Sequence, residues 1–181
     1  MSTLPHEVIE GSERRWAYVV AGVVGFMLAV IIFTSAHLIA QPPSNVETID
    51  ASRLHLAGEF LEENLGTEVR PDGSVVVRVV AQQYSFVPAC IVVPADAPVV
   101  FRVTSPDVVH GFLITDTNVN TMVVPGFVSQ VHTDFTRTGD LLMPCHEYCG
   151  LGHSEMWATV QVVPESEFKP GADGRVSCAQ R

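Results

Sequence analysis

Four residues in the last quarter of the chain have the types and spacing of a metal site. Cys145 and Cys149 are four positions apart, His153 follows after four more, and Met156 three after that. Thiolate, imidazole and thioether groups together select copper over hard cations such as Mg²⁺ and Ca²⁺. The loop therefore predicts a copper site.

The second cysteine distinguishes this loop from that of a mononuclear site. A mononuclear blue-copper site needs one cysteine, two histidines and a weak axial methionine. Two thiolates held close together can instead each bridge two metal ions, and each ion then needs one imidazole and one weak outer ligand. His153 and Met156 supply two of these four positions, so we expect a second histidine from a distant part of the chain.

The loop Cys-His-Glu-Tyr-Cys-Gly-Leu-Gly-His-Ser-Glu-Met resembles the binuclear copper loop, called CuA, of subunit II of haem–copper oxidases. Upstream, the run Ser-Pro-Asp-Val-Val-His-Gly-Phe at residues 105–112 resembles the strand that delivers the family's first copper histidine. With a single predicted membrane span, the chain is most similar to the type-B branch, the Thermus-like ba-type cytochrome c oxidases. The resemblance covers residues 75–163 well and 12–40 loosely, and it does not cover 41–74 or the tail after 164.

The resemblance implies a role for each residue of ligand type. Two cysteines bridge both copper ions, while one histidine and one weak ligand complete each ion. These are Cys145 and Cys149 as bridges, His110 and Met156 on one copper, and His153 with the backbone carbonyl of Glu147 on the other. The alternatives are a structural buried histidine at position 110 and a methionine at 156 that only fills the core.

Three side chains near the predicted ligands have other expected roles. The Glu147 side chain departs from the glutamine expected in the Thermus-like pattern, and in other branches such a glutamate also helps bind Mg²⁺ at the subunit interface. A magnesium ion at Glu147 is therefore left open. His146 is interpreted as a surface residue or a neighbour of the ligands, and Asp107 as the cap of a turn.

The function that the resemblance implies is that of the subunit through which electrons enter a terminal haem–copper oxidase. Single electrons come from a c-type cytochrome or a small copper protein and pass to haem in the large subunit I, where oxygen is reduced. One span cannot provide haem ligands, so this chain takes part in catalysis only within the assembly and has no catalytic residue of its own. The alternatives are the CuA subunit of a nitric oxide reductase, a membrane-anchored copper chaperone and a quinol-oxidase subunit.

The N-terminal part of the chain predicts a membrane anchor. Residues 1–15 are a polar flank, and residues 16–40 contain no Asp, Glu, Lys or Arg. At about 1.5 Å per residue this stretch covers roughly 37 Å, enough to cross a ~30 Å hydrocarbon core. Arg14 and Arg15 precede it and no Lys or Arg follows until Arg53, which predicts a cytoplasmic N-terminus in the cell membrane and a periplasmic or extracellular domain.

The rest of the chain predicts an all-β domain. Residues 41–74 read as a linker that contains a short amphipathic helix at 52–65. From Val75 to residue 164, β-branched and aromatic runs alternate with turn signals, which indicates a two-sheet antiparallel sandwich. The resemblance makes this sandwich a cupredoxin-like barrel. Residues 165–181 form a C-terminal tail.

Other residues yield weaker expectations. Tyr84, Phe86 and Trp157 are candidates for an apolar surface that meets the electron donor, although such rings are more often core residues. Cys90 and Cys178 form a disulfide or remain two thiols.

Two charge features complete the sequence reading. In type-B oxidases a glutamate at the position of Glu13 lies near the mouth of the proton-uptake channel, but a solvated flank is slightly favoured here. The net charge of −10 argues against a nucleic-acid partner and suits a basic protein partner.

Overall fold

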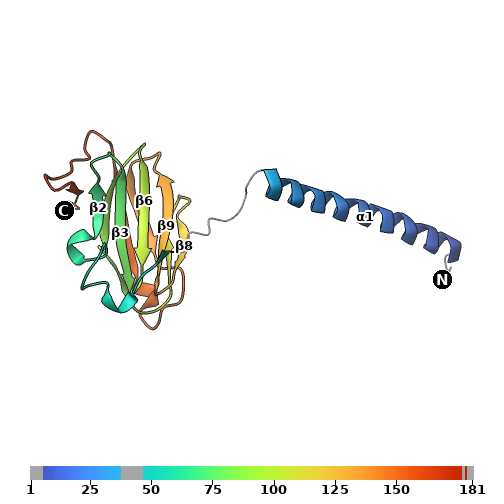
Figure 1. Cartoon of the computed structure of the whole chain (residues 1–181), viewed down its shortest axis with the longest axis horizontal. Helices are drawn as coiled ribbons and strands as arrows, with labels where there is room; N and C mark the ends of the chain where they lie inside the picture. The colour runs from blue at the N-terminus through green and yellow to red at the C-terminus, as the bar shows by residue number, and fades with distance from the viewer. Residues whose placement is uncertain (1–5, 38–46, 177, 179–181) are drawn as a thin grey trace. The chain divides into compact units, whose positions relative to one another are not determined.

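The computed structural model describes residues 6–37, 47–176 and 178. The chain divides into two compact units, Met1–Asn45 and Val46–Arg181 (Figure 1). Residues 1–5 of the predicted flank, 38–40 of the predicted span, 41–46 of the predicted linker, and 177 and 179–181 of the tail lie outside the described residues.

The first unit contains one long helix, α1 (His6–His37). Its segment Ile9–Ala36 is long and apolar enough to cross a membrane. Large apolar side chains are exposed along the segment, including Trp16 and Phe26, which are 65% and 70% exposed. Because a membrane-spanning helix satisfies its backbone hydrogen bonds internally and turns apolar side chains to lipid, the composition of α1 suits a single membrane span.

The second unit is a β-sandwich whose larger sheet faces the viewer in Figure 1. Its strands are rich in valine and other β-branched residues, which fit a pleated, half-buried surface. In spatial order they are β1 (Glu47–Thr48), β9 (Phe127–Asp134), β6 (Pro98–Thr104), β3 (Val75–Gln82), β2 (Gly66–Val69) and β12 (Arg175–Val176), with β4 (Ser85–Val87) paired to β3.

Three strands form a smaller sheet, and two more form a separate hairpin. The smaller sheet has the order β10 (Gly139–Pro144), β11 (Trp157–Val163), β5 (Cys90–Pro94), and the hairpin joins β7 (His110–Leu113) to β8 (Asn120–Val123). The core contains closely packed rings, with the Phe112 ring 5.9 Å from that of Phe86 and 5.7 Å from that of Phe101. The predicted sandwich is therefore confirmed.

The sandwich differs from the predicted antiparallel one at two of its strand pairings, which are parallel. Strand β3 pairs in parallel with β6, and β5 pairs in parallel with β11. After β3 and β4 the chain crosses to the smaller sheet as β5 and then returns to the larger sheet as β6. This passage through the opposite sheet brings β6 beside β3 in the same direction.

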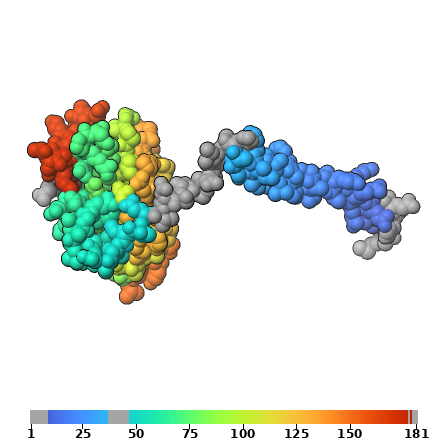
Figure 2. Space-filling view, in the orientation of Figure 1, coloured from blue at the N-terminus to red at the C-terminus, as the bar shows by residue number. Residues whose placement is uncertain are grey.

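The amphipathic helix predicted for residues 52–65 is also wrong. The segment contains only two single turns of 3₁₀ helix, η1 (Ala51–Arg53) and η2 (Glu62–Asn64). Leu54 and Phe60 of this segment are both buried against the sheet. Residues six positions apart do not share a face of an α-helix, so a helix could not bury both side chains on the same sheet. Between them Gly58 has a φ of +101°, which ends any helix. The segment lies over one face of the domain, as its cyan atoms in Figure 2 show.

An ion cluster fastens this segment to the sheet. Arg78 and Arg102 are register partners on β3 and β6, and the carboxylate of Glu59 bonds to both guanidinium groups. Glu68 bonds to Arg78, and Glu47 to Arg102 at 2.6 Å. Burial by itself raises the pKa of Glu59, but hydrogen bonds and charges from Arg102 and Arg78 outweigh it and hold that pKa below its ordinary value. Glu59 therefore stays ionised between two arginines that are almost fully buried.

The C-terminal tail is tied to the domain at two places. Strand β12 pairs with β2, and Arg175 donates hydrogen bonds to the carbonyl of Leu65 and the side chain of Asn64. A disulfide bond joins Cys178 to Cys90, the first residue of β5, with their Cα atoms 6.1 Å apart. The structure thus contains the pairing that the sequence left open.

Replacing Glu59 tests the ion cluster. Glu59→Gln leaves two nearly buried guanidinium groups without their shared carboxylate, so we expect the free energy of unfolding at pH 7 to fall by about 1–3 kcal/mol. The folded-state pKa lies below the ordinary value of 4.5. The stabilisation is therefore fully present above about pH 4.5 and is lost as the pH falls through the folded-state value. Urea unfolding of the full chain in detergent, followed by near-ultraviolet circular dichroism, measures both effects.

The matched control is Glu47→Gln, which removes one carboxylate whose side chain is 50% exposed. We expect it to cost less than about 1 kcal/mol. Equal losses for the two variants, or a Glu59→Gln effect that persists unchanged at pH 3, would contradict the role given to Glu59.

Candidate metal centre

The predicted ligands come together at one end of the sandwich. His110 is the first residue of β7, and the loop 145–156 joins β10 to the adjacent strand β11. A backbone hydrogen bond of 2.9 Å from Cys145 to the carbonyl of Met156 closes this loop. Within the loop the 3₁₀ turn η3 (His153–Glu155) turns the His153 side chain toward Cys149.

The two thiol groups form the centre of the cluster. Their Sγ atoms are 4.0 Å apart. Around Cys145 lie Nδ1 of His110 at 3.9 Å and the backbone carbonyl oxygen of Glu147 at 3.2 Å. Around Cys149 lie Nδ1 of His153 and Sδ of Met156, each at 3.6 Å. In the described part of the chain, the donor atoms of His110, Cys145 and Cys149 all lie within 4.8 Å of one another.

These distances fit donors that share metal ions. For metal bonds of about 2.0–2.3 Å, neighbouring donors around one ion lie roughly 3.3–4 Å apart. Two sulfur atoms with a nitrogen beside each, plus a thioether and a carbonyl, suit two soft or borderline ions and offer no carboxylate to a hard cation. His110 is fully buried, and Met156 and both cysteines are nearly so, so these donors are shielded from water.

Without metal, the Cys149 thiol holds its proton tightly. Burial, followed by the neighbouring Cys145, raises the pKa of Cys149 from 9.0 to about 11. A metal ion must therefore displace a proton when it binds to this sulfur.

Asp107 contacts the predicted ligand His110. Its Oδ1 atom lies 2.8 Å from Nε2 of His110, on the opposite side of the ring from the thiols. Burial raises the pKa of Asp107, but hydrogen bonds from His110 and from the backbone amides of Gln83 and Val108 outweigh it, so the pKa lies below its ordinary value. An ionised Asp107 only accepts hydrogen bonds, so Nε2 of His110 donates to it, and Nδ1 is the ring nitrogen that faces the sulfur atoms. Asp107 thus binds the backbone of a turn, as expected, and also a side chain of the cluster.

The aromatic residues near the cluster separate into surface and core. Tyr84 is 39% exposed and Trp157 is 55% exposed, whereas Phe86 is 1% exposed and packs on Phe112. The expectation that Phe86 contributes to a surface is therefore wrong, because strand β4 turns this ring into the core.

Sequence reasoning missed two exposed apolar residues of the loop itself. Tyr148 is 70% exposed, with its ring 5.9 Å from that of His153, and Leu151 is 95% exposed. The sequence did contain a signal for this exposure. Both are large apolar residues between the predicted ligands of a short loop, and a short loop cannot bury every side chain.

The remaining candidates lie outside the cluster. The His146 ring is exposed and lies against the backbone of Gly111, where an added Cβ would be 2.5 Å from its Nδ1 atom. The Glu147 carboxylate accepts a hydrogen bond of 3.1 Å from the backbone of Tyr148. Glu13 belongs to helix α1 in the other unit.

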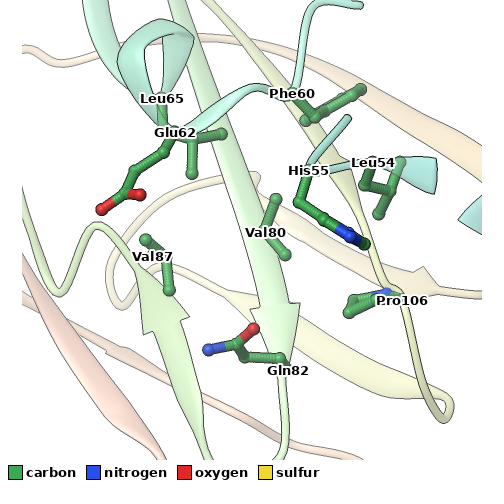
Figure 3. A pocket seen from close by; sticks show the side chains of 9 residues that line it. All are labelled: Leu54, His55, Phe60, Glu62, Leu65, Val80, Gln82, Val87 and Pro106. Atoms are coloured by element: carbon green, nitrogen blue, oxygen red, sulfur yellow. The ribbon is translucent and has the colours of Figure 1, made fainter. Parts of the chain in front are cut away.

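A mostly apolar cavity of about 410 Å³ lies between strands β3 and β4 and the segment 54–65, and none of the clustered donors lines it. Figure 3 shows its lining, with Val80 and Val87 on the sheet and the segment around Leu54 and Phe60 above them. It is the space left where the irregular segment 51–65 packs on the sheet.

Comparison with known proteins gives a consistent result. The family described as "Cytochrome C oxidase subunit II, periplasmic domain" matches residues 75–163. A cytochrome c oxidase subunit 2 from Thermus thermophilus is 33% identical over 159 residues, which cover 87% of this chain and 95% of that protein. A second protein of the same description from Thermus thermophilus is 36% identical over 121 residues, covering 67% of this chain and 90% of that protein.

A solved structure agrees in fold. A chain from the cryo-EM structure of a heme-copper terminal oxidase dimer matches with a TM-score of 0.60 and 23% identity, covering 84% of this chain and 99% of that chain. The likeness supports the cupredoxin-like fold, and the Thermus relatives support the branch that the loop resembles.

The raised pKa of Cys149 predicts slow alkylation of the metal-free chain. Since the folded-state pKa is about 11 against an ordinary 9.0, Cys149 should react with iodoacetamide at pH 8 roughly 100-fold more slowly than in the urea-unfolded chain. Stability that depends on the protonated thiol is fully present below pH 9 and is lost as the pH rises through about 11. Peptide mass spectrometry gives the rate, and equal rates in folded and unfolded chains would contradict the prediction.

Proposed function

The chain belongs to the cytochrome c oxidase subunit II family, and we propose that it is the subunit through which single electrons enter a terminal haem–copper oxidase. The electrons pass to haem in the large subunit, where oxygen is reduced. The observation that carries this proposal is the pair of thiol sulfurs 4.0 Å apart, with one imidazole nitrogen beside each.

The proposed cofactor is a binuclear copper centre. The residues that would hold it are Cys145 and Cys149, together with His110, Met156, His153 and the carbonyl of Glu147. A pair of copper ions bound there would supply one-electron transfer, with its charge shared over two metals. The chain's own residues provide burial and fixed positions. His110 begins the paired strand β7 and Cys145 directly follows the paired strand β10, so little of their surroundings has to move when the charge of the site changes.

The electron donor is proposed to be a c-type cytochrome or a small copper protein. Tyr84, Tyr148, Leu151 and Trp157 supply exposed apolar surface close to the ligands, and such a patch suits a transient protein contact. The net charge of −10 favours a basic partner by long-range attraction.

Helix α1 is proposed to anchor the chain in the cell membrane beside subunit I, with the metal domain on the periplasmic or extracellular side. Arg14 and Arg15 precede the apolar segment and support a cytoplasmic N-terminus. Glu13 stands at the same end of the helix. A proton-uptake role for it predicts slower proton uptake in Glu13→Ala, and unchanged turnover would discard that role.

A magnesium ion at the contact with subunit I is a further proposal, with the Glu147 carboxylate as one ligand. This carboxylate accepts one backbone hydrogen bond and retains free lone pairs. Metal analysis of the intact complex should show one magnesium ion that Glu147→Gln loses.

Replacing a bridging sulfur tests the function. In the intact complex, Cys149→Ser should lower oxygen consumption with reduced cytochrome c by more than the roughly 10–100-fold typical of losing a neighbour of a metal ligand. Ser154→Ala is the matched control, because Ser154 lies in the same loop, is exposed and is not a proposed ligand. Its rate should equal that of the wild type.

The same assay distinguishes the final acceptor. The wild-type complex should consume oxygen in preference to nitric oxide. Rapid nitric oxide consumption without oxygen consumption would assign the chain to a nitric oxide reductase. Full oxygen consumption by Cys149→Ser would contradict a role of the cysteine pair in electron transfer.

A further inference from the structure

The two halves of the metal cluster come from separate parts of the chain and must be held in register. His110 starts strand β7, while the other donors lie on the loop between β10 and β11. Two polar residues outside the ligand set connect these halves. We propose that Asp107 and Gln83 are positioning residues, forming a hydrogen-bonded brace that fixes His110 against the cysteine loop; this inference rests on the proposed copper function.

Asp107 forms the first half of the brace by dividing its two carboxylate oxygens between two segments. Oδ1 accepts from Nε2 of His110 at 2.8 Å and from the backbone amide of Val108 at 2.6 Å. Oδ2 accepts from the backbone amide of Gln83 at 2.7 Å. Ser105 donates a further hydrogen bond of 3.1 Å to Oδ1. With both oxygens engaged, the carboxylate is held in one orientation relative to the His110 ring.

Gln83 forms the second half. It lies in the two-residue turn between β3 and β4, and its side-chain amide donates a hydrogen bond to the backbone carbonyl of Cys149. One residue therefore binds Asp107 through its backbone and the cysteine loop through its side chain. The path from His110 to Cys149 thus runs through Asp107 and Gln83, although Gln83 is 24 positions from Asp107 and 66 from Cys149.

The neighbouring ring keeps this turn on the loop. Tyr84 lies so close to Gly150 and Gly152 that an added Cβ at either glycine would be 2.6 Å from the Tyr84 side chain. Gly150 also has a φ of +130°, which residues with a side chain rarely adopt. The β3–β4 turn and the copper loop are therefore in direct backbone-to-ring contact, which holds the Gln83 amide within reach of Cys149.

The brace has a specific chemical consequence. A carboxylate that accepts a hydrogen bond from Nε2–H favours the tautomer whose Nδ1 lone pair is available to a metal. The same hydrogen bond makes Nδ1 more basic. A more basic ligand favours the oxidised metal. Loss of the carboxylate should therefore weaken copper binding and raise the reduction potential, whereas a residue that only supported the fold would leave the potential unchanged.

Two variants test the brace in the full chain reconstituted with copper in detergent. Asp107→Asn keeps the shape but has a single acceptor oxygen, so it cannot serve both His110 and Gln83. Gln83→Ala removes only the amide that reaches Cys149 and leaves every contact of Asp107 in place. Copper affinity is measured by competition with a copper chelator, and the reduction potential by redox titration of the thiolate-to-copper absorption bands.

We expect Asp107→Asn to lower copper affinity roughly 10–100-fold and to raise the reduction potential. Gln83→Ala should lower the affinity less. Because both residues act through one path, the double variant should lose less than the product of the two single losses. The control is Asp96→Asn, which removes the same charge from an exposed residue at the opposite end of β6 and should leave both quantities unchanged.

The results separate the brace from the proposed function. A wild-type chain that takes up no copper pair would overturn the proposed function and the brace together. A wild-type chain that takes up the pair, with Asp107→Asn and Gln83→Ala both matching Asp96→Asn in affinity and potential, would overturn the brace alone. Losses that multiply in the double variant would show that the two residues do not act through one path, which also contradicts it.

Discussion

The structure depends on holding two sulfur atoms 4.0 Å apart inside a protein. Two thiolates at that distance repel each other, and burial makes each negative charge costlier. The high pKa of Cys149 expresses both effects in the metal-free chain. The Cys149 thiol therefore keeps its proton near neutral pH in the metal-free chain, and a metal ion that binds this sulfur displaces that proton. The surrounding strands and hydrogen bonds must hold the two sulfurs at this distance in the metal-free chain.

The sandwich meets the requirement with paired strands and with links between distant segments. Strands β10 and β11 fix the two ends of the cysteine loop, and strand β7, which begins with His110, lies against β10. Asp107 and Gln83 then join the histidine strand to the loop. Away from the metal cluster, Glu59 between two arginines and the Cys90–Cys178 disulfide fasten the segments that precede and follow the sandwich. These ion pairs, side-chain hydrogen bonds and the disulfide thus fasten segments that lack the backbone hydrogen bonds of paired strands.

Sequence reasoning succeeded where the chemistry is local. The proposed ligands of the loop stand within twelve consecutive residues, which the structure brings together, and valine-rich runs mark most of the longer strands. It failed where tertiary contacts decide. Leu54 and Phe60 are anchored to the sheet in a way that excludes a helix, and Phe86 turns inward although its neighbour Tyr84 turns outward. Strand β3 pairs in parallel with β6, and Gln83 bonds to Cys149. Both contacts join segments that are far apart in the sequence, and no repeating pattern of residues predicts them.

The most direct test of the central claim is the copper content of the full chain, measured together with its electron paramagnetic resonance spectrum. Two sulfurs that bridge two ions predict two copper ions per chain that share one unpaired electron, giving a seven-line hyperfine pattern. One copper ion per chain with a four-line pattern, or no bound copper, would contradict the account.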